Sequence, residues 1–187
     1  MKRSLAVVLM LCCLAACRSA PSGVYHDESM DFGAVRSVAV MPFANFTRET
    51  QAAERVRDVF VTHLFASGSI YVIPPGEVKR GVQRTGINEP AAPSPEEIVK
   101  FAAIVKVDAV ITGAVREYGE IRSGQSSSGV VALSVSMIEA QTGKVVWSAS
   151  STRGGIGLSA RLFGGGGRPM DDVTEQAVKD VLDKLFK

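Results

Sequence analysis

The pattern of apolar and polar residues opens on one continuous apolar run. Lys2 and Arg3 precede the run, which extends from Leu5 to Leu14 and ends in Ala15-Ala16-Cys17. A basic start, a short apolar stretch and small residues at its end are typical of a secretory signal peptide. A membrane-spanning helix needs about 20 apolar residues, so this run is too short to be one. We therefore predict a signal peptide over residues 1–16.

The stretch Leu14-Ala15-Ala16-Cys17 also has the form of a lipobox. A signal peptidase requires small residues beside the bond that it cuts, and the Cys17 thiol can carry a diacylglyceryl group once Cys17 is the new N-terminus. Two or more acyl chains anchor a protein stably, whereas a single chain binds a membrane only marginally. The alternative is cleavage at an ordinary signal-peptide site with Cys17 incidental. We predict lipidation of Cys17.

The residues after the lipobox lack a regular apolar pattern. Pro21 and Gly23 lie in this stretch, which predicts a tether leading away from the membrane. We assign residues 17–34 to this lipidated tether. His26 lies there among acidic residues, but one histidine with scattered carboxylates is more typical of a solvated linker than of a metal site.

From residue 35 onward, the pattern predicts a single α/β domain over residues 35–187. Helices are expected where apolar residues recur at spacings of three and four, and strands where they alternate or run without interruption. The uninterrupted run from Val38 to Phe43 indicates a strand buried on both faces, as in a parallel sheet. The predicted strands are 35–43, 70–73, 108–122, 131–137 and 144–148, and the predicted helices are 50–66, 76–85, 94–105 and 171–186.

Local signals fix several of these elements. Ser94-Pro95-Glu96-Glu97 forms a capping box with proline at the first helical position. The tight turn Gln141-Thr142-Gly143-Lys144 joins two strands into a hairpin, and the polar loop 45–50 carries side chains able to cap a helix. The predicted fold is therefore a mixed parallel and antiparallel sheet flanked by helices, with an antiparallel meander added to a parallel pair.

Composition narrows the class of function. Without Lys2 and Arg3 the chain keeps 19 basic residues against 19 acidic ones, so no electrostatic footprint for nucleic acid remains. Cys12 and Cys13 leave with the signal peptide and Cys17 carries the lipid. The mature domain then has no thiol for a disulfide or a metal site.

Candidate catalytic and cofactor motifs are weak in this sequence. Residues 155–160 match the dinucleotide pattern G-x-G-x-x-A, but the glycines that follow oppose the helix start that would present amides to a pyrophosphate. The zinc-protease motif H-E-x-x-H, the C-x-x-C pair, the nucleophile elbow G-x-S-x-G and the P-loop do not occur. We expect a protein that is not an enzyme and binds no cofactor.

Apolar side chains in the glycine-rich stretch 154–167 are the candidate contact residues. Leu162 and Phe163 lie between glycines, and exposed apolar residues on a flexible segment suit a membrane or a neighbouring subunit. The alternative is that both side chains pack back over the sheet. Trp147 presents the same choice, because a strand tryptophan lies either in the core or in an interface.

Three stretches resemble a known group of envelope proteins. Residues 38–45, 108–113 and 142–147 are similar to the CsgG-like lipoproteins of the curli secretion channel, which are related to the N-terminal domain of TolB. The PelC lipoprotein of polysaccharide export and the activator lipoproteins of penicillin-binding proteins share this fold. The resemblance implies a domain on the periplasmic face of the outer membrane that acts through protein contacts. Several members form rings, which implies a homo-oligomer.

The resemblance leads to two hypotheses of function. The first is a structural or assembly component of an export complex, with other envelope or secretion proteins as partners. Arg18 follows the cysteine where an inner-membrane lipoprotein usually has aspartate, which implies the outer membrane. The alternative is an activator of a peptidoglycan synthase, although such activators carry long tethers and residues 18–34 span only about 50 Å. A self-contained pore is not expected, because residues 154–167 cannot form two membrane-crossing strands of about ten residues each.

Overall fold

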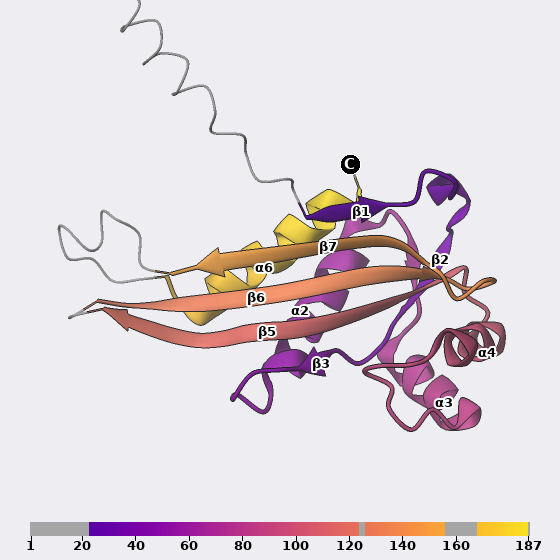
Figure 1. Ribbon diagram of the computed structural model, residues 1–187, viewed down its shortest axis with the longest axis horizontal. Coiled ribbons are helices and arrows are strands. Elements are labelled where there is room, and N and C mark those ends of the chain that lie inside the picture. The colour runs from indigo at the N-terminus through magenta and orange to yellow at the C-terminus, as the bar shows by residue number, and fades with distance from the viewer. Residues whose placement is uncertain (1–22, 124–125, 156–167, 187) are drawn as a thin grey trace, which may run out of the picture.

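A computed structural model describes residues 23–123, 126–155 and 168–186. They form one seven-stranded sheet in the order β1-β7-β6-β5-β2-β4, with β3 beside β5 (Figure 1). The single α/β domain with a mixed sheet and flanking helices confirms the predicted fold class. The elements are β1 (Val24–His26), η1 (Phe32–Ala34), β2 (Ser37–Val40), β3 (Ala44–Asn45), α2 (Ala52–Ser67), β4 (Tyr71–Val72), α3 (Pro75–Thr85), α4 (Pro95–Val105), β5 (Ala109–Ser123), β6 (Ser126–Glu139), β7 (Val145–Gly154) and α6 (Met170–Leu185).

The sheet combines the predicted parallel part and antiparallel meander. Strand β2 pairs in parallel with both β4 and β5, while β5, β6 and β7 pair antiparallel in sequence order. Along β2, Val38 and Val40 belong to one buried cluster and Ala39 belongs to the other. The uninterrupted apolar run is therefore explained by burial on both faces.

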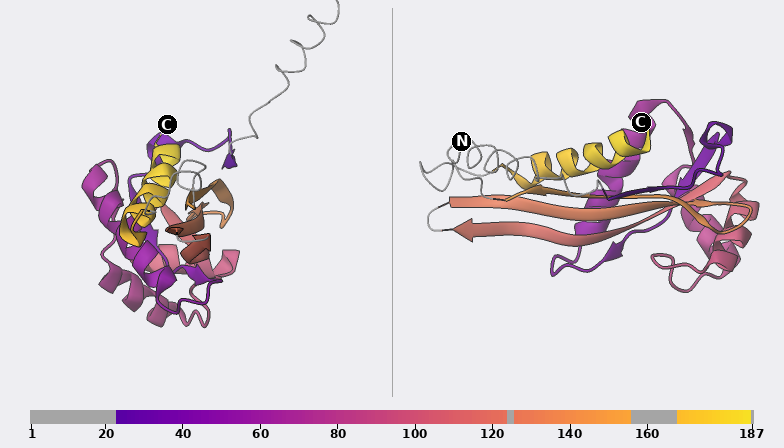
Figure 2. Two further views of the ribbon diagram at one scale, coloured as in Figure 1. Left: turned by 90° about the vertical axis from the view of Figure 1, so that its left-hand side faces the viewer. Right: turned by 45° about the horizontal axis from the view of Figure 1, so that its top comes forward.

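The helices form a layer on each side of the sheet. Helices α2 and α6 cover one face and pack against each other, and α3 and α4 lie on the opposite side near β2 (Figures 1 and 2). Helix α2 ends at Gly68, whose φ of 61° allows the left-handed cap. The capping box of Ser94 and Glu97 is present at the start of α4. Both helix boundaries thus follow the local signals in the sequence.

The loop before α2 differs from the prediction. Gln51 occupies the N-cap of α2 without a side-chain capping bond. The Asn45 side chain instead donates to the carbonyl oxygens of Glu49 and Thr50 and accepts from Thr47. Asn45 itself lies in β3, paired with Val115 of β5. The loop side chains therefore shape the turn and do not cap the helix.

The predicted tether also needs correction in its second half. Val24–His26 forms the edge strand β1, paired antiparallel with Trp147–Ala149 of β7. Asp31 caps the short helix η1, and Phe32 packs against the core. The folded domain thus includes residues that were assigned to the linker, because a three-residue edge strand carries too short a pattern to be detected. The part of the tether before Gly23 stays a prediction.

Strands β5 and β6 extend past the last residue pair of β7 as an arm, formed by residues 120–123 and 126–129. A β-bulge between Val115 and Glu117 interrupts the β5–β6 register before the arm begins. Helix α6 starts beside the arm, where the amide of Gly129 donates to the carbonyl oxygen of Arg168 at 3.3 Å. Figure 2 shows the arm projecting beyond the helices.

Asp108 joins the start of β5 to the start of β2. Its Oδ2 accepts from the Ser37 hydroxyl at 2.9 Å and from the backbone amides of Arg36 and Ser37 at 3.0 and 2.9 Å. The hydroxyl bond from Ser37 and the two amide bonds outweigh desolvation and hold the pKa of the Asp108 carboxyl below its ordinary value of 3.8. The charged carboxylate therefore stabilises the fold.

We expect Asp108→Asn to lower the free energy of unfolding by about 1 kcal/mol at about pH 7, a small value because the carboxylate is exposed. Since folding lowers the pKa, the stabilisation is present above pH 3.8 and is lost as the pH falls through the folded-state pKa. Urea unfolding at about pH 7 and about pH 3 measures both values. Asp183→Asn, on the exposed side of α6, is the control. An equal loss for Asp108→Asn at both pH values would contradict this role.

Candidate functional site: an uncovered face of the sheet

One face of the β5–β6–β7 meander is covered and the other is largely bare. Along β6, Val131, Leu133 and Val135 point toward α2 and α6 and are buried. The residues between them point the other way, where α3 and α4 cover only the end near Ile138. Over the remainder of this side, no described element lies in front of the three strands (Figure 1).

Small residues make up this bare surface, which we name the small-residue face. Ser134 lies opposite Ala114 on β5 and Ser150 on β7. The Ser136 hydroxyl donates to the Ser148 hydroxyl at 3.0 Å across the strands. Because these side chains are short, another protein can approach without ordering long side chains, which limits the entropy lost on contact. The members of the face are Thr112, Ala114, Ala132, Ser134, Ser136, Ser148, Ser150 and Thr152, all half-buried or exposed.

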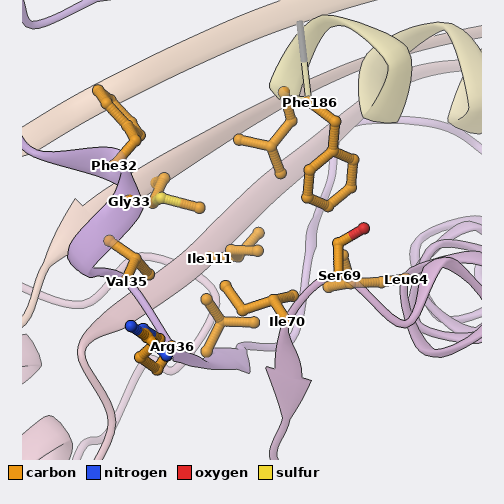
Figure 3. Close-up of a pocket in the computed structure, with 12 residues that line it drawn as sticks. Phe32, Gly33, Val35, Arg36, Leu64, Ser69, Ile70, Ile111 and Phe186 are labelled. Carbon is orange, nitrogen blue, oxygen red and sulfur yellow. The ribbon is translucent and has the colours of Figure 1, made fainter.

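A separate pocket of about 380 Å³ lies between η1, the start of β2 and the ends of α2 and α6 (Figure 3). Apolar side chains such as Val35, Ile70 and Leu185 line most of it. Arg36 and Ser69 are its polar side chains, and its lining holds no carboxylate, imidazole or thiol. A serine without a neighbouring base is not an activated nucleophile. The pocket can therefore hold an apolar group but offers no acid–base pair.

The buried and half-buried charges serve the fold. The Arg57 guanidinium donates to the carbonyl oxygens of Val40 and Met41 at 2.7 and 2.9 Å, which satisfies the end of β2. Burial lowers the pKa of Arg57. Groups of three or more histidine, cysteine or acidic residues that could hold a metal ion do not occur in the described ranges.

A second charged group ties α6 to β7. Asp180 binds Arg153 of β7 and accepts from Lys184 Nζ at 2.8 Å. Burial raises the pKa of the Asp180 carboxyl, but the hydrogen bond from Lys184 and the charge of Arg153 outweigh it, so the pKa lies below its ordinary value. Lys184 also donates to the Ser150 carbonyl oxygen at 2.8 Å. Because Arg153 and Lys184 bind the Asp180 carboxylate, we assign Asp180 a structural role.

The structure describes only one of the candidate contact residues. Cys17, Leu162 and Phe163 lie outside the described residues. Trp147 is 1% exposed and belongs to the core, so of its two candidate placements the structure has the buried one and not a contact with a membrane or a subunit. Its register partner Met137 faces α2 and α6, so Trp147 faces them too. Sequence alone could not assign this face, because strand periodicity does not say which side the helices cover.

The glycine pattern that begins at residue 155 has a structural role where it is described. Gly154 and Gly155 adopt φ values of 92° and 90° at the end of β7. The Gly155 amide donates to the carbonyl oxygen of Gly129 on β6 at 3.0 Å. Here the glycines permit positive φ and a close approach of two backbones. Residues 156–160 of the pattern lie outside the described residues.

The small-residue face had a partial signal in the sequence. Ala132, Ser134 and Ser136 alternate with buried residues, which indicated a strand with one better-buried face. The missing information was that α3 and α4 reach only one end of the opposite side.

Within the part of the chain that the structure describes, no helix has both the length and the apolar character needed to cross a membrane.

A family model now identifies the group to which this sequence and fold correspond. The model described as "Putative lipoprotein GNA1162-like" matches residues 29–186. The chain belongs to this family. The expected label of CsgG-like or TolB-like protein was thus too specific, whereas the expected lipoprotein family is confirmed. A comparison with curated proteins found no match.

Several solved structures share the fold of this chain. The lipoprotein GNA1162 from Neisseria meningitidis superposes with a TM-score of 0.59 at 20% identity, covering 81% of this chain and 98% of that chain. A PelC dodecamer from Paraburkholderia phytofirmans gives 0.54 at 21% identity, covering 80% and 86%. The LpoB C-terminal domain from Escherichia coli gives 0.50 at 14% identity, covering 67% and 87%. At these identities the likeness is one of fold.

Proposed function

We propose that this GNA1162-like protein is a non-enzymatic, lipid-anchored component of an export or secretion complex, and that it acts as an oligomer. The observation that carries the proposal is the small-residue face, which offers a broad contact surface on rigid strands. The fold shared with a protein solved as a dodecamer supports self-association. A ring requires two different surfaces on each subunit, and the small-residue face would supply one of them.

The anchor and location form the second part of the proposal. Lipid on Cys17 would hold the domain on the outer membrane, facing the periplasm, as the lipobox and Arg18 imply. Leu162 and Phe163 stay candidate contacts with lipid or a neighbouring subunit.

Native mass spectrometry of the mature protein in detergent, with the lipid retained, tests the oligomer. We expect a discrete closed oligomer for the wild type. Ser134→Arg places a long charged side chain at the centre of the small-residue face and should shift the spectrum to monomers. Because Ser134 is only half-buried, the melting temperature of the Ser134→Arg variant should differ little from that of the wild type. Gln83→Arg adds the same charge on the exposed side of α3 and should leave the oligomer intact.

Two outcomes would overturn parts of this proposal. An intact oligomer in Ser134→Arg would remove the small-residue face from the interface. A wild-type monomer across the accessible concentration range would favour the alternative, an activator of a peptidoglycan synthase. The distinguishing measurement is then synthase activity with and without the protein.

A further inference from the structure

We propose that the tip of the β5–β6 arm is the membrane-facing end of the domain and that Ile121 contacts the lipid bilayer. The proposal rests on the lipid anchor at Cys17 given above but is independent of the oligomer. It assigns a membrane contact to described residues that no sequence motif had singled out. Its first basis is the direction in which β1 enters the sheet.

Strand β1 points its N-terminal end toward the arm. Val24 pairs with Ala149 and His26 pairs with Trp147, so the chain before Val24 leads toward the later residues of β7. The last of those residues, Gly154, pairs with Val130 at the root of the arm. The polypeptide that carries the proposed anchor therefore joins the domain from the arm side.

The tether is too short to lift the arm clear of the membrane in this direction. Cys17 precedes Val24 by seven residues, which reach about 24 Å when fully extended. Val24 is level with Val135 on β6, and Ile121 pairs with Ser128, seven residues farther toward the tip. At a strand rise of about 3.4 Å per residue this distance is also about 24 Å. A fully extended tether along the arm would place Cys17 level with Ile121, and a shorter path brings the membrane nearer to the sheet.

The side chains near the tip suit a lipid surface. Ile121 is 44% exposed, although moving an isoleucine side chain out of water lowers the free energy. Arg122 follows it with a side chain 81% exposed, and its distance of 4.0 Å to the Glu120 carboxylate makes only a weak surface pair. An apolar side chain and a weakly paired guanidinium at the same tip fit the boundary between acyl chains and phosphate headgroups. The partner that this tip fits is thus a phospholipid bilayer.

The mature domain allows a site-specific test, because acylated Cys17 is its only cysteine and a new cysteine would be the single free thiol. Ile121→Cys would carry a nitroxide spin label at the arm tip. Ile104→Cys is the matched control, since Ile104 is 40% exposed on α4 at the other end of the sheet. Both lipidated variants would be placed on vesicles of phosphatidylethanolamine and phosphatidylglycerol. Electron paramagnetic resonance then compares the accessibility of each label to oxygen and to a nickel chelate.

We expect vesicle binding to raise the oxygen-to-nickel accessibility ratio at position 121 by roughly twofold or more, because oxygen concentrates in the acyl region and the chelate is excluded. The ratio at position 104 should not change. Protein that floats with the vesicles while its 121 label stays open to nickel would overturn this proposal and leave the anchor standing. Protein that does not float would overturn the lipid anchor, and this inference with it.

Discussion

Replacing Gly154 with alanine is expected to lower the free energy of unfolding by about 3 kcal/mol or more, because two penalties combine there. The backbone φ of 92° is a conformation that residues with a Cβ rarely adopt. A Cβ at this position would also lie 2.0 Å from the carbonyl oxygen of Gly129 on β6. A backbone atom cannot turn aside as a side chain can, so the end of β7 would have to separate from β6. Urea unfolding monitored by circular dichroism measures the loss.

Gly155→Ala is the matched control for this close contact. Gly155 has nearly the same φ, 90°, but a Cβ there meets no atom within 4 Å. The hydrogen bond from the backbone amide at position 155 to the Gly129 carbonyl oxygen would also remain. We expect a loss of only about 1–2 kcal/mol from the backbone conformation alone. Equal losses in the two variants would show that the contact with Gly129 does not constrain the strand end.

The two glycines illustrate what the sequence could and could not predict. The many glycines in residues 154–167 indicated a loop that is costly to order. The sequence could not reveal that Gly154 lies against β6, because that contact depends on the β6–β7 register. The same holds for Trp147, whose buried position follows from its pairing with Met137. Both positions depend on which surface a strand residue meets, a property set by elements distant in sequence.

Elements with strong local signals were predicted well. The capping box of Ser94 and Glu97 satisfies free amides within its own helix, so it needs no tertiary information. The hairpin of β6 and β7 follows from alternation and from Gly143, whose φ of 69° suits the turn. By contrast, β1 and β3 contain three and two residues and exist only because a longer strand offers them a partner. Such short strands have no period of their own to detect.

The candidate site depends even more on long-range arrangement. Serines at positions 134 and 136 were recognised as the less buried side of β6, which is a local property. Their proposed role as a contact surface rests on the arrangement of the helices, since α2 and α6 occupy the other face and α3 and α4 stop near β2. The direction of the arm toward the proposed anchor likewise comes from the antiparallel pairing of β1 with β7. Both proposed contact surfaces therefore depend on the topology of the fold, which no single motif encodes.

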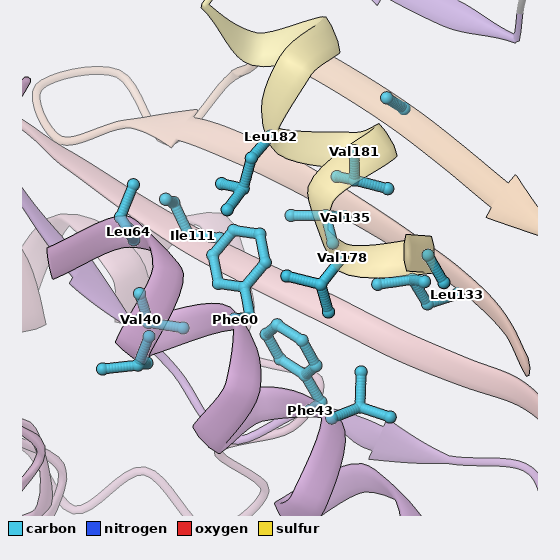
Figure 4. Packing of buried hydrophobic residues seen from close by; sticks show 14 of the residues in the cluster. Val40, Phe43, Phe60, Leu64, Ile111, Leu133, Val135, Val178, Val181 and Leu182 are labelled. Carbon is cyan, nitrogen blue, oxygen red and sulfur yellow. The ribbon is translucent and has the colours of Figure 1, made fainter. Parts of the chain in front are cut away.

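Phe60 is the position at which the covered face of the sheet depends most on one side chain. It is fully buried in α2, and its ring lies 5.7 Å from the ring of Phe43 at an interplanar angle of 60°. Figure 4 shows it between Phe43 and the α6 residues Val178 and Leu182. It thus joins the segment after β2, helix α2 and helix α6 in one cluster. The aromatic pair has the edge-on geometry that adds to simple burial.

We expect Phe60→Ala to lower the free energy of unfolding by about 3–5 kcal/mol, since it removes buried apolar area and leaves a cavity that these three elements cannot close. Domains of this size have a total stability of about 5–15 kcal/mol, so much of the population could unfold on mild heating. Phe65→Ala in the same helix is the control: Phe65 is 48% exposed, and its loss should be well below that of Phe60. Thermal and urea unfolding of both variants measure the difference.

The oligomer provides a second measurement on the same variant. Phe60 is 0% exposed and lies on the side opposite the small-residue face, so it cannot contact a neighbouring subunit directly. Any loss of oligomer in Phe60→Ala should therefore follow the unfolded fraction as temperature rises, whereas Ser134→Arg should dissociate the oligomer while the domain stays folded. Dissociation of Phe60→Ala at temperatures where its circular dichroism is still native would contradict this separation. The small-residue face would then depend on the packing behind it as well as on its own side chains.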